Sequence, residues 1–144
     1  MQVETVVIEY LKVIGVVRRF GNVLFGAIKE PKEKPQKIFL LDDLNVLGKS
    51  KLKDIAAKTG HSPQNLCMLY NGLEKEGLIA REIDPENRRN TYYFITDKGK
   101  KVLEKSKKEA RAVIQTIFEN LSEADLKTLK SNLESTSAIL EKIV

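Results

Sequence analysis

The segment from Lys49 to Lys98 constrains the fold of this chain most, because it places two short helices around a tight turn and follows them with two short strands. Residues 50–59 and 63–76 have the apolar spacing of helices. Ser62 is a favourable N-cap, and Pro63 stands at the first helical position, where its missing N–H costs nothing. This order predicts a helix–turn–helix, in which the two helices cross closely.

Three residues have the properties that such a crossing and its turn require. Ala56 is small enough for the helices to approach, Gly60 tolerates a positive φ in the turn, and Leu66 is an aliphatic anchor that points back into the crossing. We predict these three as the core of the helix–turn–helix. Two packed helices without a DNA role would show the same spacing, so the segment that follows has to separate the two interpretations.

That segment is a predicted β-hairpin with a long polar tip. The expected strands are residues 79–83 and 91–95, the second rich in β-branched and aromatic residues. Arg88 and Arg89 stand at the tip, where a flexible cation can enter a minor groove and sense its negative potential. A hairpin placed directly after a helix–turn–helix favours a DNA-binding wing. An arginine pair that is only solvated remains the alternative.

The second helix of the motif divides into two faces. Its buried side is predicted to hold Leu66, Leu69, Tyr70 and Leu73. Amides dominate the outer side, and Asn or Gln can pair bidentately with adenine, while Met can contact a thymine methyl group. The helix N-terminus favours a phosphate. An ordinary polar surface is the alternative. The predicted DNA-binding residues are Ser62, Gln64, Asn65, Met68, Asn71, Arg81, Arg88, Arg89 and Asn90. Among them, Arg81 lies on the first strand of the hairpin and is expected to reach a phosphate.

The remaining residues are predicted to be helical, with more apolar surface than a lone chain of this size can cover. Helices are expected at 4–29, 38–47, 97–120 and 122–142, with a charged linker at 30–36. Exposed apolar area of this kind marks an interface, and a two-fold homodimer closes it most simply. A helical bundle within one monomer is the alternative. We divide the chain into an N-terminal dimerisation helix with its linker (1–36), a winged helix–turn–helix (37–98) and C-terminal dimerisation helices (99–144).

Charge and composition narrow the classes of function. The net charge is +5, and residues 49–108 carry 14 Lys and Arg against 8 Asp and Glu, which leaves the rest of the chain near neutral. A basic centre favours a polyanionic partner, although a solvated lysine-rich surface would look similar. One Cys and one His exclude an intramolecular disulfide and the usual zinc sites. We predict no enzyme, no metal, no cofactor, no membrane span and a cytoplasmic location.

Four runs of residues resemble the MarR family of bacterial and archaeal repressors. They are Ser62-Pro63-x-x-Leu66, Leu73-Glu74-Lys75-x-Gly77-Leu78-Ile79-x-Arg81, Asp84-Pro85-Glu86-Asn87-Arg88-Arg89 and Ile95-Thr96-Asp97-Lys98-Gly99. The resemblance is specific over about residues 52–103. It implies a mainly α fold with a β-hairpin wing, a dimer whose first and last two helices interlock, and release of double-stranded DNA by a small lipophilic or phenolic ligand. The implied ligand crevice lies between the dimer helices and the winged domain.

Three departures from the family pattern bear on function. Asn87 stands where the family usually has an Asp that holds the minor-groove arginine, here Arg89, so that salt bridge is expected to be lost. Met68 and Gly72 replace residues that are often basic. Cys67 lies beside the predicted DNA face, either as a redox sensor or as a partly buried filler.

The sequence therefore predicts a sequence-specific transcriptional regulator that acts as a repressor on a near-palindromic operator. The second helix of the motif, which would be the recognition helix, has a net charge near zero. A winged-helix module that binds a protein partner instead of DNA is therefore the second hypothesis.

Overall fold

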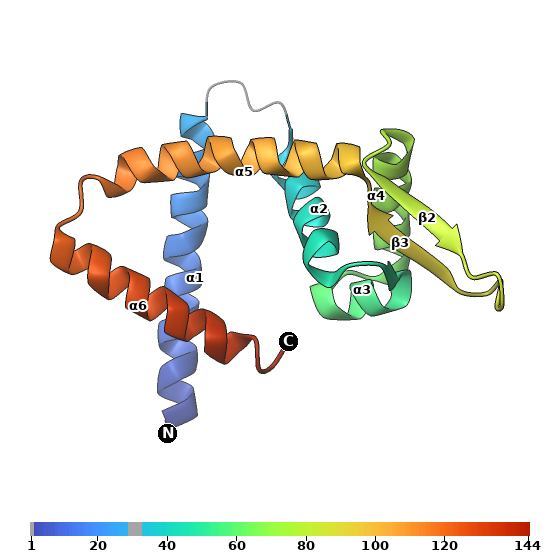
Figure 1. Ribbon diagram of the computed structural model, residues 1–144. Coiled ribbons are helices and arrows are strands. Elements are labelled where there is room, and N and C mark those ends of the chain that lie inside the picture. Colours follow the sequence, from blue (N-terminus) through green and yellow to red (C-terminus); the bar gives the residue numbers. More distant parts are fainter. Residues whose placement is uncertain (1, 29–32) are drawn as a thin grey trace.

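The computed structural model of the chain describes residues 2–28 and 33–144 and shows six helices and a three-stranded antiparallel sheet in those ranges (Figure 1). The elements in chain order are α1 (Gln2–Ala27), α2 (Pro35–Leu47), β1 (Ser50–Lys51), α3 (Leu52–Thr59), α4 (Pro63–Lys75), β2 (Ile79–Ile83), β3 (Thr91–Ile95), α5 (Asp97–Phe118) and α6 (Glu123–Leu140). The predicted mainly α fold with a β-hairpin wing is confirmed.

The core lies where α2, α3, α4, the sheet and the first turns of α5 meet. Most of its members are aliphatic, as the composition suggests, because the chain has no Trp and few aromatic residues. Tyr70 and Tyr93 are the exceptions, and both are buried with their ring centroids 5.2 Å apart. The side chains with the least exposure are Leu41, Leu44, Ile55, Leu66, Tyr70, Ile79 and Leu103.

The first correction concerns Ser50 and Lys51, which the sequence pattern assigns to a helix. In the structure they form strand β1, which pairs with β3 so that Ser50 faces Tyr93 and Lys51 faces Tyr92. The strand order is β1-β3-β2. Two residues are too few to show an alternating pattern, and their partner strand lies some 40 positions later, so no local signal could reveal them.

The second correction concerns the start of α2, which begins at Pro35 and not at Ile38. Pro35 occupies the first turn of the helix, where a backbone N–H would have no partner within the helix. The sequence pattern instead places this proline within the predicted linker at 30–36. Residues 29–32, which include the first three residues of that linker and the predicted end of the first helix, lie outside the described residues.

The arrangement of the helices separates two regions (Figure 1). The helices α2, α3 and α4 and the sheet form the winged part, while α1 lies to one side of it and α5 runs across both. Phe20 of α1 stacks on Phe118 of α5 at 5.9 Å between ring centroids, and Phe25 meets Phe39 of α2 edge-on at 6.4 Å. In the described ranges, no helix combines the length and the apolar character needed to cross a lipid bilayer.

Candidate nucleic-acid interface

The helix–turn–helix is built from α3, the turn after it and α4. Gly60 ends α3 with φ +75°, a backbone conformation that favours glycine. The Ser62 side chain then caps α4, because its Oγ accepts a hydrogen bond from the backbone N–H of Asn65 at 3.2 Å. Ala56 and Leu66 are buried where the helices cross, with exposures of 2% and 0%. The turn therefore fixes the direction in which α4 leaves the core.

The outer face of α4 carries the amides that the sequence analysis singled out. Gln64, Asn65 and Asn71 are all exposed, and so is Met68, which keeps 65% of its surface open. A shallow concave surface of the helix is lined by Pro63, Gln64, Cys67, Met68 and Asn71. This face combines hydrogen-bonding and apolar groups, and it projects away from the core.

The wing ends in a turn that keeps two cations in solvent. Arg88 and Arg89 are exposed, and within residues 2–28 and 33–144 neither guanidinium takes part in an ion pair. Asn87 supports the turn itself, since its Oδ1 accepts from the backbone N–H of Arg89 at 3.1 Å. The Asn90 backbone closes the turn, accepting from the N–H of Asp84 and donating to the carbonyl of Asn87, both at 2.9 Å. Backbone hydrogen bonds and the Asn87 side chain thus hold the tip, while its two guanidinium groups stay without an ion-pair partner among the described residues.

Arg81 differs from the expectation of a cation free to contact a phosphate. Its Nε donates to both carboxylate oxygens of Glu74, at 3.0 and 2.9 Å, and its Nη2 donates to one of them at 2.7 Å. The Arg81 hydrogen bonds hold the pKa of the Glu74 carboxyl below its usual value. Arg81 therefore ties β2 to α4, a contact that joins residues seven positions apart.

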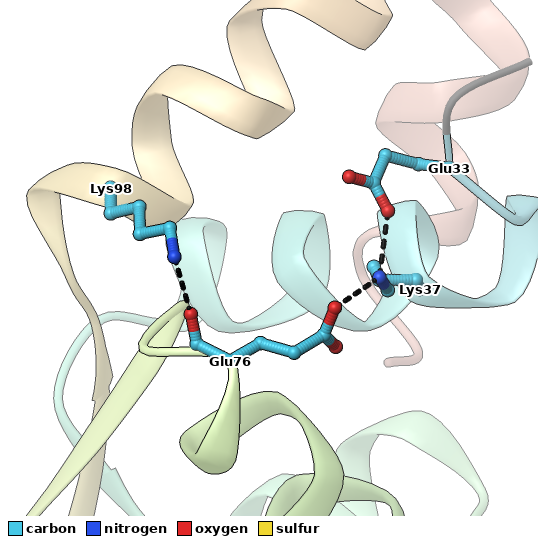
Figure 2. Close-up of polar contacts among 4 residues, drawn as sticks. All are labelled: Glu33, Lys37, Glu76 and Lys98. Atoms are coloured by element: carbon cyan, nitrogen blue, oxygen red, sulfur yellow. Dashed lines mark hydrogen bonds and ion pairs between the residues drawn. The ribbon is translucent and has the colours of Figure 1, made fainter.

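A second polar network ties the end of α4 to its neighbours (Figure 2). The ammonium group of Lys37 on α2 lies 2.7 Å from a carboxylate oxygen of Glu33 and 2.7 Å from one of Glu76. Lys98 on α5 donates to the backbone carbonyl of Glu76 at 2.8 Å. Because the two carboxylates stabilise its charged form, the pKa of Lys37 is raised above its usual value.

We expect Lys37→Met to lower the free energy of unfolding by at most about 1 kcal/mol at neutral pH, the range of partly exposed ion pairs. The pKa of Lys37 is raised in the folded state, so its contribution is complete below the unfolded value of 10.5 and disappears as the pH rises through the folded value. Urea denaturation at pH 7 and at strongly alkaline pH measures this.

The control for this substitution is Lys130→Met. Lys130 has one exposed partner, Glu134, at 3.8 Å, and should show almost no effect at either pH. A Lys37→Met penalty that stays the same at alkaline pH would contradict the assignment.

A cavity of about 350 Å³ lies between α1, α2 and α5. Its wall is mostly apolar, with Phe20, Phe25 and Phe39 as aromatic members. Asp42 and Lys107 also line it and form an ion pair at 2.7 Å. Glu33 of the Lys37 network belongs to the same wall. Local sequence patterns do not indicate which residues line this cavity, because three different helices supply them.

The described part of the chain offers no group of three His, Cys, Asp or Glu side chains arranged to hold a metal ion. Cys67 is partly buried and unpaired, beside Met68 on α4.

This arrangement of a helix–turn–helix and a wing also occurs in known proteins to which the chain is similar. Residues 34–91 match the MarR family model. A stretch of 91 residues is 32% identical to the HTH-type transcriptional regulator YkoM of Bacillus subtilis and spans 61% of this chain and 59% of that relative. The chain therefore aligns with little more than half of YkoM.

Three solved structures extend the likeness to almost the whole chain. MarR of E. coli in its apo form superposes with a TM-score of 0.73 at 16% identity, over 87% of this chain and 94% of that one. Streptococcus pneumoniae FabT in complex with DNA gives 0.69 at 18%, over 94% and 99%. Bordetella bronchiseptica BpsR, whose DNA binding is regulated by 6-hydroxynicotinic acid, gives 0.64 at 21%, over 88% and 98%. Residues 34–91 are therefore a MarR-family domain, carried in a chain that has the overall fold of MarR-family regulators.

Proposed function

We propose that the protein is a sequence-specific regulator of transcription that binds double-stranded DNA and acts as a repressor. The observation that carries the proposal is the exposed amide-rich face of α4 beside a wing whose two arginines are unpaired. A helix of this width fits the major groove, and the arginines of the wing can reach the adjacent minor groove. The complex of FabT with DNA supports this use of the fold.

The regulator is proposed to be a homodimer formed through its terminal helices. Helix α1 exposes a nearly continuous apolar surface, and α6 adds Leu126, Leu133 and Ile139. Exposed apolar area on this scale marks an interface, and a two-fold axis would set two copies of α4 about 34 Å apart, one turn of DNA. Light scattering of the purified chain tests this, and a monomer at micromolar concentration would reject it.

A small ligand in the cavity between α1, α2 and α5 is proposed to control DNA binding. The mostly apolar wall suits a lipophilic or phenolic molecule, and the Asp42–Lys107 pair offers charged groups to an acidic substituent. The regulation of BpsR by 6-hydroxynicotinic acid supports this kind of ligand. A thermal-shift screen with small aromatic acids, followed by DNA binding with each hit, tests it.

The DNA-binding proposal predicts that Arg89→Ala weakens binding on the order of tenfold at all sequences, because a minor-groove cation adds affinity without reading a major-groove edge. Fluorescence anisotropy with duplexes selected from a random pool measures the loss. The affinity of the unchanged protein should fall steeply with salt, since phosphate neutralisation releases counterions. Gln64→Ala and Asn65→Ala should instead alter the preferred sequence.

The matched control is Arg111→Ala, which removes the same charge from an exposed position on α5. It should leave affinity nearly unchanged. Binding that ignores salt would count against a DNA-binding function.

The second candidate is a winged-helix module that binds a protein partner, favoured by the absence of exposed cations on α4 before Lys75. Capture of a stoichiometric partner, together with no selected DNA, would establish it.

A further inference from the structure

Three side chains link the outer face of α4 to the first strand of the wing. Arg81 on β2 holds Glu74 through the three hydrogen bonds described above, and its Nη2 also donates to Oδ1 of Asn71 at 3.4 Å. Asn71 lies one helical turn before Glu74, on the side of α4 that faces solvent. The three residues form one polar chain, and only Asn71 belongs to the amide-rich face.

The chemistry of Arg81 decides how the Asn71 amide is oriented. A guanidinium has only N–H donors, so the amide atom that faces it has to be the acceptor Oδ1, and Nδ2 points the other way. Within residues 2–28 and 33–144 no hydrogen bond engages Nδ2. Its two protons and the second lone pair of Oδ1 therefore remain available to a partner in solvent.

Arg81 is itself well held. Its contact with Glu74 is charge-assisted, with both carboxylate oxygens engaged, a geometry that a guanidinium provides and an ammonium does not. The central carbon of the guanidinium, Cζ, also lies over the Tyr93 ring, 5.8 Å from its centroid. Orienting Asn71 before binding lowers the entropic cost of fixing its side chain against a base.

We propose that Asn71 reads an adenine in the major groove, with Arg81 and Glu74 as its positioning residues. Adenine presents the N7 acceptor beside the N6 amino donor, which match Nδ2 and the free lone pair of Oδ1. Guanine presents two acceptors, so Oδ1 would find no donor there. The proposal rests on the proposed function, because it requires α4 in the major groove. It replaces the phosphate contact expected of Arg81.

The test starts from the half-site that the unchanged protein selects from a random pool of duplexes. Affinities are then measured for the unchanged protein and for Asn71→Ala, Arg81→Lys and Arg81→Ala. The duplexes carry single substitutions at each position, and each is measured over a series of salt concentrations. A duplex with 7-deazaadenine at the assigned adenine removes the N7 acceptor alone.

We expect Asn71→Ala to lose about 10- to 100-fold in affinity on the selected site and to lose discrimination at one A·T pair. The 7-deazaadenine duplex should weaken binding of the unchanged protein but not of Asn71→Ala. Both Arg81 variants should lose discrimination at that same pair, while the salt dependence of their affinity stays that of the unchanged protein. If Arg81 only stabilised the fold, its variants would not lose discrimination at the same A·T pair as Asn71→Ala.

A phosphate contact by Arg81 predicts the opposite pattern. Arg81→Lys would then keep its affinity, and Arg81→Ala would weaken all duplexes alike and reduce the salt slope by about one. Either result overturns the proposal, and so does full discrimination by Asn71→Ala.

Two further measurements separate the remaining cases. Arg81→Ala also removes packing on Tyr93 and can lower stability, so Glu74→Gln, which leaves Arg81 in place but weakens its anchor, should lose the same discrimination. If the folded, unchanged protein selects no DNA sequence, the proposed function is wrong. If it selects a sequence and the variants keep their preference at the A·T pair, only the proposed role of Asn71 and Arg81 is wrong.

Discussion

Replacing Gly99 with alanine should lower the free energy of unfolding by about 3 kcal/mol, the upper end of the cost of overpacking. A Cβ at this position would lie 2.1 Å from the carbonyl oxygen of Leu78 and 2.8 Å from Cγ1 of Ile95. The first of these is backbone, which cannot rotate away. Gly99 lies in the first turn of α5, where alanine would otherwise be the better helix former.

The contact at Gly99 is part of a junction that holds α5 to the base of the wing. The Thr96 backbone N–H donates to the carbonyl of Leu78 at 3.0 Å, and its hydroxyl donates to the carbonyl of Gly77 at 2.6 Å. The same hydroxyl oxygen accepts from the N–H of Gly99 at 3.1 Å and caps the helix. An alanine would push α5 away from this junction and so displace the wing from the terminal helices.

Gly72→Ala is the matched control for this prediction. Gly72 is exposed in α4, and a Cβ there would meet no atom within 4 Å. This substitution should therefore stabilise the protein by roughly 0.5–1 kcal/mol. Urea denaturation of both variants at one protein concentration gives the comparison, because the stability of a dimer depends on concentration. An unchanged or increased stability of Gly99→Ala would contradict the close packing of this junction.

The double substitution Val6→Asp and Val13→Asp should abolish the proposed dimer and lower operator affinity by about 10²- to 10⁴-fold. Both valines are on α1, with 65% and 54% of their surface open in the single chain. A two-fold interface would bury four carboxylates without partners, a large penalty. Loss of the dimer removes the gain from two linked half-sites, so each monomer would bind as weakly as one recognition helix alone.

The control is Val46→Asp, which adds a carboxylate at a valine on α2 with 75% of its surface open, outside the terminal helices. It should remain dimeric. Analytical ultracentrifugation gives the oligomeric state, anisotropy with the selected operator gives the affinity, and circular dichroism confirms that the variants are folded. A double variant that stays dimeric with full affinity would show that α1 is not the interface.

Local signals were enough to predict α4 and the two strands of the hairpin, β2 and β3. The helix α4 begins after the Ser62 cap with Pro63 in its first turn, and Gly77 follows its end with φ +75°. The strands β2 and β3 have the predicted bounds of 79–83 and 91–95. Each of these features depends on residues within one or two turns of chain, so the sequence shows them directly.

Other features depend on partners that are distant in the sequence. The strand β1 exists because β3 lies beside it, and Pro35 starts a helix because the residues after it pack on the core. Exposure of the α4 amides could be predicted from helical periodicity. The family resemblance implied a crevice between the dimer helices and the winged domain, yet the side chains that line the cavity between α1, α2 and α5 could not be predicted.

The sequence by itself determined where the recognition helix and wing begin and end and which side of α4 faces outward, because caps, turn residues and periodicity act locally. Only the tertiary structure decided that Arg81 pairs with Glu74 instead of standing free, and that Lys37 joins Glu33 to Glu76. Such ion pairs depend on where folded elements bring charges together, and a residue type alone does not indicate which partner it will meet.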